Sequence, residues 1–563
     1  MSRTHRLSTR RSIVAALLTS VVLIGLVAGS GGQAATITGT AKAAPPTIVL
    51  APSEAVQQRH RRLTVRTVTA PRAGGYIPGS TVGPDVEHLR YRYGPFEIGP
   101  GQNPNLLDPG LPAPARAGFI TRFEPNLELA VGTVPPANVL HLHHAVWLVN
   151  GSAAWFADAE KSVFAPPAGY GWPTAPTDRW ILNHMLHNLY PTRAKAYLTW
   201  DVDFVPAGSP TGRKLRGIGT LWSDVRGGEN YPVFDVPFQP RGTGRYTYPT
   251  DLHGAAARAY TKGLNSIVVP ADGALVLAVG HLHPGGLWNS LTLTRGGRTT
   301  EIHHGAVRYY DPAGPVSWDM AMGVTRADWK VAVRRGDILT ITATYDSRHA
   351  AWYESMGLMV VGFAPGDRTG FDPFSPTLDR ATRLTHGRLA ENRGSGGAPT
   401  TLPIASTLPN GPRFGSGQGR SVSISEFLYR PGDLSQPALR NPPVVPAGTP
   451  LRFVNADASL GIPHTITACR APCSASAGHG YPRADGAIPF DSGQLAFGPV
   501  LLTAFANRSN WQTPATLPPG TYSYYCRIHP FMRGSFRVRP STRAEIQSAA
   551  QAAGLAGSKA PAP

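Results

Sequence analysis

Glycine and proline interrupt this sequence often, and long helical heptads are absent from it. The 563 residues include 62 Gly and 55 Pro, scattered without a collagen-like period. Between them lie short runs of β-branched and aromatic residues, such as 274–279, 337–344 and 357–363, which are typical of strands bounded by turns. With 42% hydrophobic residues and 11 Trp, the chain can bury several cores. The sequence therefore predicts an all-β protein of several domains, at roughly 150 residues each.

The first 35 residues have the parts of an export signal. An arginine-rich start is followed by the apolar stretch 13–29 and by a small-residue cleavage motif at 32–34. Residues 9–14 loosely resemble a twin-arginine signal. We therefore interpret residues 1–35 as a signal peptide and expect a periplasmic, cell-surface or secreted protein. The alternative is an uncleaved anchor, which would place the protein at the membrane.

The chain carries a formal net charge of +19. The excess of basic residues is spread along the sequence, and no module of interleaved basic and aromatic residues accompanies it. We expect a solvated or wall-binding surface, and we do not expect nucleic acid as a partner.

The chain has three cysteines. In an exported protein, an odd number leaves one cysteine without a disulfide partner in the chain. Cys469 and Cys473 are close enough in the sequence to form a disulfide in an oxidising compartment. Cys526 is left over, which indicates a use for its thiol.

Changes in composition divide the chain into segments. The third domain stands apart because the segment before it is rich in Gly, Pro, Ser and Thr and contains Gly394–Gly397, as linkers are. The expected segments are a loose lead-in at 36–84, two β-rich blocks at 85–212 and 213–365, a linker at 366–420, a compact domain at 421–540 and an alanine-rich tail at 541–563.

The strongest functional motif follows a strand expected at 520–525. It reads Cys526-Arg527-Ile528-His529-Pro530-Phe531-Met532, and it supplies a thiolate, an imidazole and a thioether within seven residues. A type 1 copper site needs two His and a Cys in a plane with a weak axial Met, and His464 supplies the missing imidazole. Sulfur favours Cu(I) while imidazole suits Cu(II), so this donor set suits one-electron exchange.

This motif resembles the copper loop of amicyanin and the plastocyanin-like cupredoxins. The resemblance covers residues 421–540, includes the run 490–493, and implies a Greek-key β-sandwich with one type 1 copper. Thr465 stands where the family more often has Asn, and an insertion carries the other two cysteines. Multicopper oxidases flank the type 1 cysteine with histidines, whereas the neighbours here are Tyr525 and Arg527. A trinuclear cluster attached through this cysteine is therefore excluded.

Three histidine clusters lie on apolar, strand-like segments of the first two blocks. They are His141-Leu142-His143-His144, His184-Met185-Leu186-His187 and His281-Leu282-His283. Residues i and i+2 of a strand share a face, so His281 and His283 can bind one metal ion. Adjacent His143 and His144 can do so only at a bulge, at a strand end, or with a metal between the two faces. The spacing equally allows His141 with His143.

The order of these clusters resembles the catalytic core of the copper type II, ascorbate-dependent monooxygenases, the peptidylglycine and dopamine hydroxylase family. The resemblance implies two jelly-roll-like β-sandwich subdomains, each with one copper, and therefore three coppers in the whole chain. The implied ligands are His143, His144 and His187 at the first copper and His281, His283 and Met356 at the second. In that family, dioxygen reacts at the Met-containing copper, which makes its three ligands the candidate catalytic residues.

The chain departs from the peptidylglycine enzymes at the residues that clamp a peptide carboxylate. The corresponding positions are Val279, Leu358 and Val360, which cannot bind a carboxylate through their side chains. We therefore expect an organic substrate other than a peptide carboxylate.

The combined motifs predict an exported copper monooxygenase that hydroxylates a C–H bond with dioxygen. The cupredoxin would relay electrons from an external donor. The alternative is a non-catalytic copper-binding or electron-transfer protein. A copper-storage protein is a third hypothesis, but such sites are more often Met-rich, and the chain has only 7 Met. We expect surface or supporting roles for His141, His184, His253, His303, His304 and His349.

Overall fold

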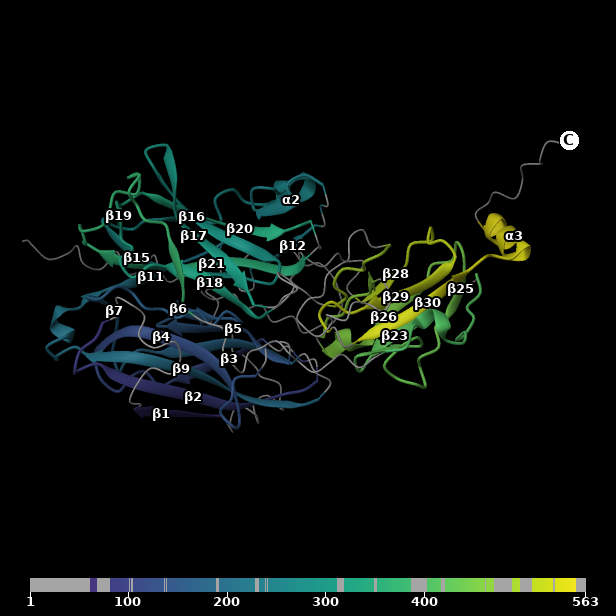
Figure 1. Cartoon of the computed structure of the whole chain (residues 1–563), viewed down its shortest axis with the longest axis horizontal. Helices are drawn as coiled ribbons and strands as arrows, with labels where there is room; N and C mark the ends of the chain where they lie inside the picture. Colours follow the sequence, from purple (N-terminus) through teal and green to yellow (C-terminus); the bar gives the residue numbers. More distant parts are fainter. Residues whose placement is uncertain are drawn as a thin grey trace, which may run out of the picture.

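The chain folds into three β-sandwiches, so the predicted all-β class is confirmed (Figure 1). The computed structural model describes residues 61–67, 81–100, 102, 105–135, 137, 139–188, 192–227, 232–237, 239, 241–310, 318–348, 352–385, 402–416, 421–460, 462–469, 489–496, 509–529 and 532–552. The expected signal peptide and Gly394–Gly397 lie outside these residues. Within them, no helix is long and apolar enough to cross a membrane. The helical elements among the described residues are α2 (Gly254–Ala259), α3 (Arg543–Ala552), η1 (Gly212–Lys214), η2 (Ala405–Thr407) and η3 (Ala456–Leu460).

Sandwich 1 packs a six-stranded sheet, in the order β1-β2-β9-β4-β7-β10, on a four-stranded sheet, β3-β8-β5-β6. Its strands are β1 (Arg62–Thr67), β2 (Glu87–Ile98), β3 (Asn105–Leu111), β4 (Gly118–Leu129), β5 (Leu140–Val149), β6 (Ser152–Ala157), β7 (Tyr170–Thr174), β8 (Trp180–Asn188), β9 (Ala194–Pro206) and β10 (Arg216–Gly217). Stacked and edge-on rings of Phe123, Trp147, Trp155 and Trp200 fill the space between the sheets. Part of the expected lead-in belongs to this sandwich, because β1 pairs with β2.

Sandwich 2 consists of the sheet β11-β21-β15-β19, with β12 beside β21, and the sheet β13-β20-β16-β17-β18-β22, with β14 beside β20. Its strands are β11 (Gly219–Asp224), β12 (Val233–Val236), β13 (Arg245–Tyr248), β14 (Ser266–Val268), β15 (Gly273–Leu282), β16 (Gly286–Arg295), β17 (Arg298–Tyr309), β18 (Met320–Thr325), β19 (Val331–Val333), β20 (Ile338–Asp346), β21 (Trp352–Pro365) and β22 (Thr382–Leu384). The chain therefore stays in this sandwich beyond residue 365, where we expected the linker, because β22 pairs with β18.

Strand β15 is apolar along nearly its whole length because it is buried on both faces. Leu282 belongs to the core of sandwich 2, together with Val361 of β21. Val279 and Val360 belong to the core of sandwich 1, with Trp147. The two sandwiches thus share a continuous apolar interface, which fixes the position of the histidines at the end of β15.

The third sandwich packs the sheet β24-β23-β26-β28 against the sheet β25-β30-β29-β27. Its strands are β23 (Ser421–Ser425), β24 (Leu428–Arg430), β25 (Val444–Pro446), β26 (Arg452–Asn455), β27 (Thr467–Cys469), β28 (Asn510–Gln512), β29 (Gly520–Tyr525) and β30 (Arg533–Arg539). β23 pairs in parallel with β26, and β25 with β30, as the crossovers of a Greek-key cupredoxin-like sandwich require. Figure 1 shows this module beside the other two, with the tail helix α3 at its outer end.

Candidate metal centre

The loop between β29 and β30 and the segment before β27, which carries His464, bring the predicted type 1 ligands together. His464, Cys526 and His529 each offer a donor atom, and these atoms lie within 4.8 Å of one another. The Sγ of Cys526 is 3.8 Å from the Nδ1 of each histidine, and all three residues are fully buried. Met532, also buried, closes the loop, since its carbonyl accepts the Cys526 N–H at 3.2 Å.

The protein environment prepares the Cys526 sulfur as a thiolate. The backbone amides of Thr465 and His529 each donate to Sγ at 3.3 Å. Burial by itself opposes ionisation, yet the hydrogen bonds from His464 and His529 hold the pKa of Cys526 well below its usual range. Asp457 Oδ2 lies 3.0 Å from His464 Nε2 and so turns Nδ1 toward the sulfur.

Thr465, where the cupredoxins more often have Asn, has a role in this structure. Its Oγ1 accepts the Arg527 N–H at 2.9 Å and thereby holds the copper loop.

Cys469 is disulfide-bonded and Cys526 is a free thiol. The expected partner of Cys469, Cys473, lies outside the described residues.

Strand β5 contains a bulge of the kind that the adjacent histidines require. Its register against β8 shifts between Leu142 and His144, so His143 is the extra residue. His141 lies directly opposite His187, and their ring centroids are 5.0 Å apart. The His143 ring is 5.8 Å from that of His141 and 6.4 Å from that of His187. Three imidazoles therefore gather at this end of β5 and β8.

The family resemblance implied that His144 is a ligand of the first copper, but the structure gives its ring other partners. Its Nε2 lies 2.9 Å from Asn183 Oδ1 and 3.3 Å from Asn105 Oδ1, so amide side chains occupy this ring nitrogen. The structure thus places His141 beside His187 in the position that the resemblance gave to His144. The sequence spacing had allowed both arrangements.

His281 and His283 lie on one face at the end of β15, as the alternation of the strand predicts. Their ring centroids are 5.1 Å apart. Leu358 of β21 lies opposite His281, which places Met356, two residues away, on the same face as the two histidines. Met356 is 4% exposed and belongs to the apolar interface with sandwich 1.

Two carboxylates that the sequence analysis missed stand among these histidines. His281 Nδ1 is 3.3 Å from Glu160 Oε2, and His281 Nε2 is 3.6 Å from Asp158 Oδ2. His283 Nε2 is 3.8 Å from the same Asp158 oxygen. Both acids follow β6, in a charged stretch between apolar residues. This charged stretch between apolar residues was the one sequence signal for the two acids. It could not predict their burial, which arises from packing between the sandwiches.

The histidines of the two sandwiches form one group, whereas the resemblance implied two separate sites. The His143 and His283 ring centroids are 5.0 Å apart. Trp318 stacks on His141 at 4.2 Å and lies 5.3 Å from both His143 and His283. We call His141, His143, His187, His281, His283, Asp158 and Glu160 the interface cluster.

The cluster offers neutral imidazoles, the form that binds metal ions. Burial lowers the pKa of His141 to about 3 and the pKa values of His143, His187 and His283 well below the usual range. Among the described residues, neither ring nitrogen of His187 has a hydrogen-bond partner, and the Nε2 atoms of His281 and His283 also have none. Buried nitrogens without hydrogen-bond partners fit metal ligands.

The cupredoxin-like module docks against this cluster. The ring of His529, a predicted type 1 ligand, meets the ring of His187 edge to face, with centroids 5.3 Å apart. Gln494 Nε2 donates to Glu354 Oε1 at 2.7 Å. Glu354 also accepts a hydrogen bond from His283 Nδ1 through its carbonyl oxygen. The two donor sets are therefore in direct contact.

His184, His253, His303 and His304 lie apart from this contact. His184 Nε2 pairs with Asp108 at 2.8 Å, and His304 stacks on Trp288. His303 lies buried in sandwich 2, and His253 precedes α2. His349 lies outside the described residues.

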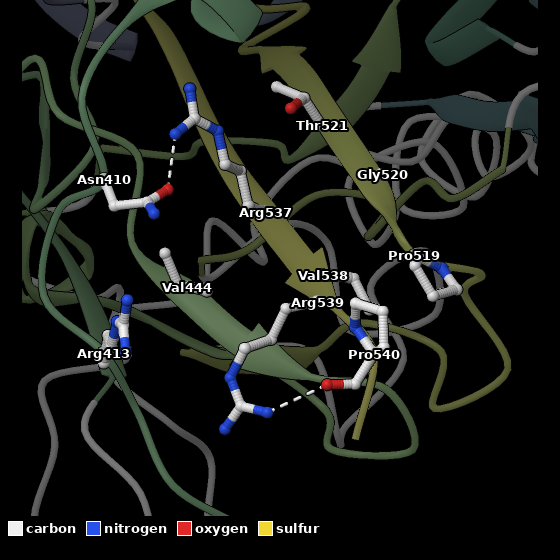
Figure 2. A pocket seen from close by; sticks show the side chains of 10 residues that line it. All are labelled: Asn410, Arg413, Val444, Pro519, Gly520, Thr521, Arg537, Val538, Arg539 and Pro540. Carbon is white, nitrogen blue, oxygen red and sulfur yellow. Dashed lines mark hydrogen bonds between the residues drawn. The ribbon is translucent and has the colours of Figure 1, made fainter. Parts of the chain in front are cut away.

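A cavity of about 480 Å³ in the cupredoxin-like module is lined by three arginines (Figure 2). It lies between the start of β29 and the end of β30, the opposite end of this hairpin from Cys526. Figure 2 shows Arg537 bonded to Asn410 and Arg539 bonded to the carbonyl of Pro540. Because internal contacts occupy these guanidinium groups, we do not assign the functional site here.

No protein-family model and no curated protein matches the chain. Among solved structures, a reduced amicyanin mutant matches at 18% identity over 25% of this chain and 97% of its own, with a TM-score of 0.12. A copper-containing nitrite reductase from Thermus scotoductus SA-01 matches at 13% identity over 49% of this chain and 59% of its own, with a TM-score of 0.14. A peptide-N(4)-(N-acetyl-β-D-glucosaminyl)asparagine amidase matches at 10% identity over 58% of this chain and 100% of its own, with a TM-score of 0.20.

These TM-scores are too low to carry an argument. The cupredoxin-like fold is assigned from the sheet topology and from the donors around Cys526. The likeness to the copper monooxygenases rests on the histidine motifs alone.

Proposed function

We propose that this chain is an exported copper oxidoreductase. Its cupredoxin-like module would supply single electrons to the interface cluster, where dioxygen would hydroxylate a C–H bond of an organic substrate. The observation that carries the proposal is the contact between His529 and His187, because it joins a type 1 donor set to a second buried set of imidazoles.

The donors around Cys526 fit copper. They are two imidazoles, a thiolate and, in the same short loop, the Met532 thioether. A copper ion bound there would supply one-electron redox chemistry with little rearrangement. Asp457 orients His464, and the backbone amide of Thr465 fixes the sulfur. Burial of the ligands excludes water from the site.

The interface cluster fits a second centre. Its five histidines come from both sandwiches, and His187, His281 and His283 carry ring nitrogens without hydrogen-bond partners in the described part of the chain. Met356 lies on the face of β21 that is level with the β15 histidines, which keeps it in the proposed catalytic set. Edge-to-face contact of His529 with His187 offers electrons a short route between the two sets.

An external one-electron donor and an unknown organic substrate complete the proposal. Val279, Leu358 and Val360 are buried apolar residues, which argues against a peptide carboxylate as the substrate. The signal-like residues 1–35 support the proposal of export.

One observation favours the alternative of a non-catalytic electron-transfer protein. The cluster histidines are at most 2% exposed, and Trp318 covers His141. A substrate would need an opening between the sandwiches to reach them.

Oxygen consumption by copper-loaded protein separates the two functions. With a reductant and apolar organic substrates, the wild-type chain should consume oxygen only when substrate is present. Met356→Ala should reduce this rate at least about tenfold, since one of the proposed catalytic side chains is lost. The visible absorbance of the Cys526 site, which lies in another module, should stay unchanged. Metal-loaded protein that exchanges electrons but never consumes oxygen with substrate would be an electron-transfer protein.

A further inference from the structure

The loop after β6 carries two carboxylates into the molecular interior. Residues 158–161 form a tight turn in which the Lys161 amide donates to the Asp158 carbonyl at 3.0 Å. Asp158 is 1% exposed and Glu160 is fully buried. Carboxylates are costly in such surroundings unless they are paired or coordinate metal ions. The turn places the two carboxylates beside His143, His281 and His283 and carries a single buried cation, Lys161, so a metal ion would balance the remaining negative charge.

Asp158 belongs to two groups of metal donors at once. In the first, its carboxylate meets His143 and His283, and in the second it meets Glu160 and His281. Within each group, one donor atom per residue lies within 4.8 Å of the others. Two donors bound at about 2.1 Å to one ion lie roughly 3–4 Å apart. Asp158 Oδ2 lies 3.6 Å from His281 Nε2 and 3.8 Å from His283 Nε2, both within this range. Glu160 Oε2 lies 3.3 Å from the other ring nitrogen of His281, Nδ1.

The orientation of the histidines is an independent observation. His283 donates from Nδ1 to the Glu354 carbonyl, so its Nε2 is free to accept and faces Asp158. Metal-ligating histidines are commonly held in this way, with one ring nitrogen bonded to a carbonyl. The Nε2 atoms of His281 and His283 have no hydrogen-bond partner among the described residues, although both side chains are 98% buried. Each of these nitrogens therefore points to a metal ion shared with the Asp158 carboxylate.

We propose that Asp158 bridges two transition-metal ions, one held with His143 and His283 and the other with His281 and Glu160. This inference rests on the proposed function, since it deepens the ligand set of the same cluster. It gives that cluster harder oxygen donors than the set of two His and a Met implied by the family resemblance. The first set, two imidazoles with one carboxylate, suits Cu(II) and Fe(II) alike, while the second set has one imidazole and two carboxylates. Ions that share a carboxylate lie about 3.5–4 Å apart.

Metal binding to the full chain tests the bridge. The Cys526→Ser background removes the type 1 thiolate, so that the remaining bound metal reports on the interface cluster. This protein is reconstituted separately with Cu(II) and, without oxygen, with Fe(II), and is then desalted and analysed for metal. We expect about two ions per chain with one of the two metals. X-ray absorption should show a metal–metal distance of about 3.5–4 Å.

Asp158→Asn removes the bridging charge at nearly constant shape. It should lose at least one ion per chain and the metal–metal signal, with affinity lowered by at least about tenfold. Asp203→Asn is the matched control, because Asp203 is equally buried and pairs with His88 at 2.6 Å in sandwich 1. This control should keep the metal content of the background protein. Glu160→Gln should lose one ion and serves as a second variant if Asp158→Asn does not fold.

Two outcomes would overturn the bridge. One is full metal content and affinity within twofold of the background in both Asp158→Asn and Glu160→Gln. The other is loss of metal in Met356→Ala but in neither carboxylate variant, which would restore the set of two His and a Met. Failure of the proposed function looks different, because bridged metal would then be present without substrate-dependent oxygen consumption.

Discussion

At the scale of single residues, the sulfur of Cys526 is surrounded by contacts that favour a thiolate ligand. Two backbone amides donate to it, two imidazoles face it at 3.8 Å, and Asp457 fixes one of those rings. All of these contacts come from short loops anchored by strands. The site is therefore formed by the folded chain itself, and metal binding requires little rearrangement.

Replacing this sulfur gives the first prediction. Copper-loaded, oxidised protein should be blue or green from the thiolate-to-copper transition, and Cys526→Ser should remove nearly all of that absorbance. The reason is that a serine hydroxyl is a poor replacement for the soft sulfur. Visible absorption, with metal analysis of the same sample, checks this, and ligands in the other two sandwiches should be unaffected. Colour that survives the substitution would contradict the assignment.

The residues differ in how far the sequence could identify them. Cys526, His529 and Met532 lie within seven residues of the chain, so their shared site could be predicted from local spacing. His281 and His283 could be paired from strand alternation alone. His141 could not be chosen over His144, because the choice depends on a bulge whose position is set by pairing with β8. Asp158 and Glu160 were missed because loop carboxylates are usually solvated, and only tertiary packing buries them here.

At the scale of elements, strand β7 is joined to the segment after β21 by a buried polar contact. The hydroxyl of Tyr170 donates to Asp367, and Thr369 donates to the same carboxylate from its amide at 2.8 Å and its hydroxyl at 2.7 Å. Burial alone would raise the pKa of Asp367, but these hydrogen bonds lower it to about 2. This contact links sandwich 1 to sandwich 2 through an ionised side chain.

The second prediction follows from this pKa. Because the folded state holds the proton more weakly than an unfolded Asp of pKa about 4, the stabilisation is fully present above pH 4 and is lost as the pH falls toward 2. Asp367→Asn should lower the free energy of unfolding by about 1–2 kcal/mol at pH 6, with a smaller difference near pH 2.5. Urea unfolding at the two pH values measures this. Asp379→Asn, at an exposed aspartate nearby in the sequence, is the control. A loss of the same size at both pH values in Asp367→Asn would contradict the prediction.

At the scale of the whole molecule, three sandwiches with separate strand sets meet at one place (Figure 1). His143 comes from the first, His283 from the second and His529 from the third, and ring contacts connect them through His187. The order of the modules could be predicted from composition and motifs. Their docking could not, because the residues that join them carry no periodic pattern.

This arrangement predicts the metal content of the chain. Fully reconstituted protein should bind about three ions, one at the Cys526 site and two in the interface cluster. Metal analysis of wild type and of Cys526→Ser should give a difference of about one ion per chain. A wild-type content of about one ion would leave only the cupredoxin-like site and would contradict the two-centre proposal.

The last prediction concerns electron flow between the two centres. His187→Phe keeps a ring against His529 but removes the imidazole nitrogens that have no hydrogen-bond partner in the described chain. Gln494→Leu removes the hydrogen bond to Glu354 and should weaken docking by about 1–2 kcal/mol, or roughly tenfold. In both variants the Cys526 site should reduce normally and keep its absorbance, because its ligands are intact.

The measurement is the recovery of visible absorbance after one electron per chain is delivered without oxygen. In wild type the electron should leave the Cys526 site for the interface cluster, so colour should return quickly. Recovery should slow at least about tenfold in both variants. Gln512→Leu is the control for the glutamine, since Gln512 is exposed at the end of β28, and it should recover as wild type does. Equal recovery in all four proteins would mean that electrons do not pass through the contact between His187 and His529, and the proposed function would lose the observation that carries it.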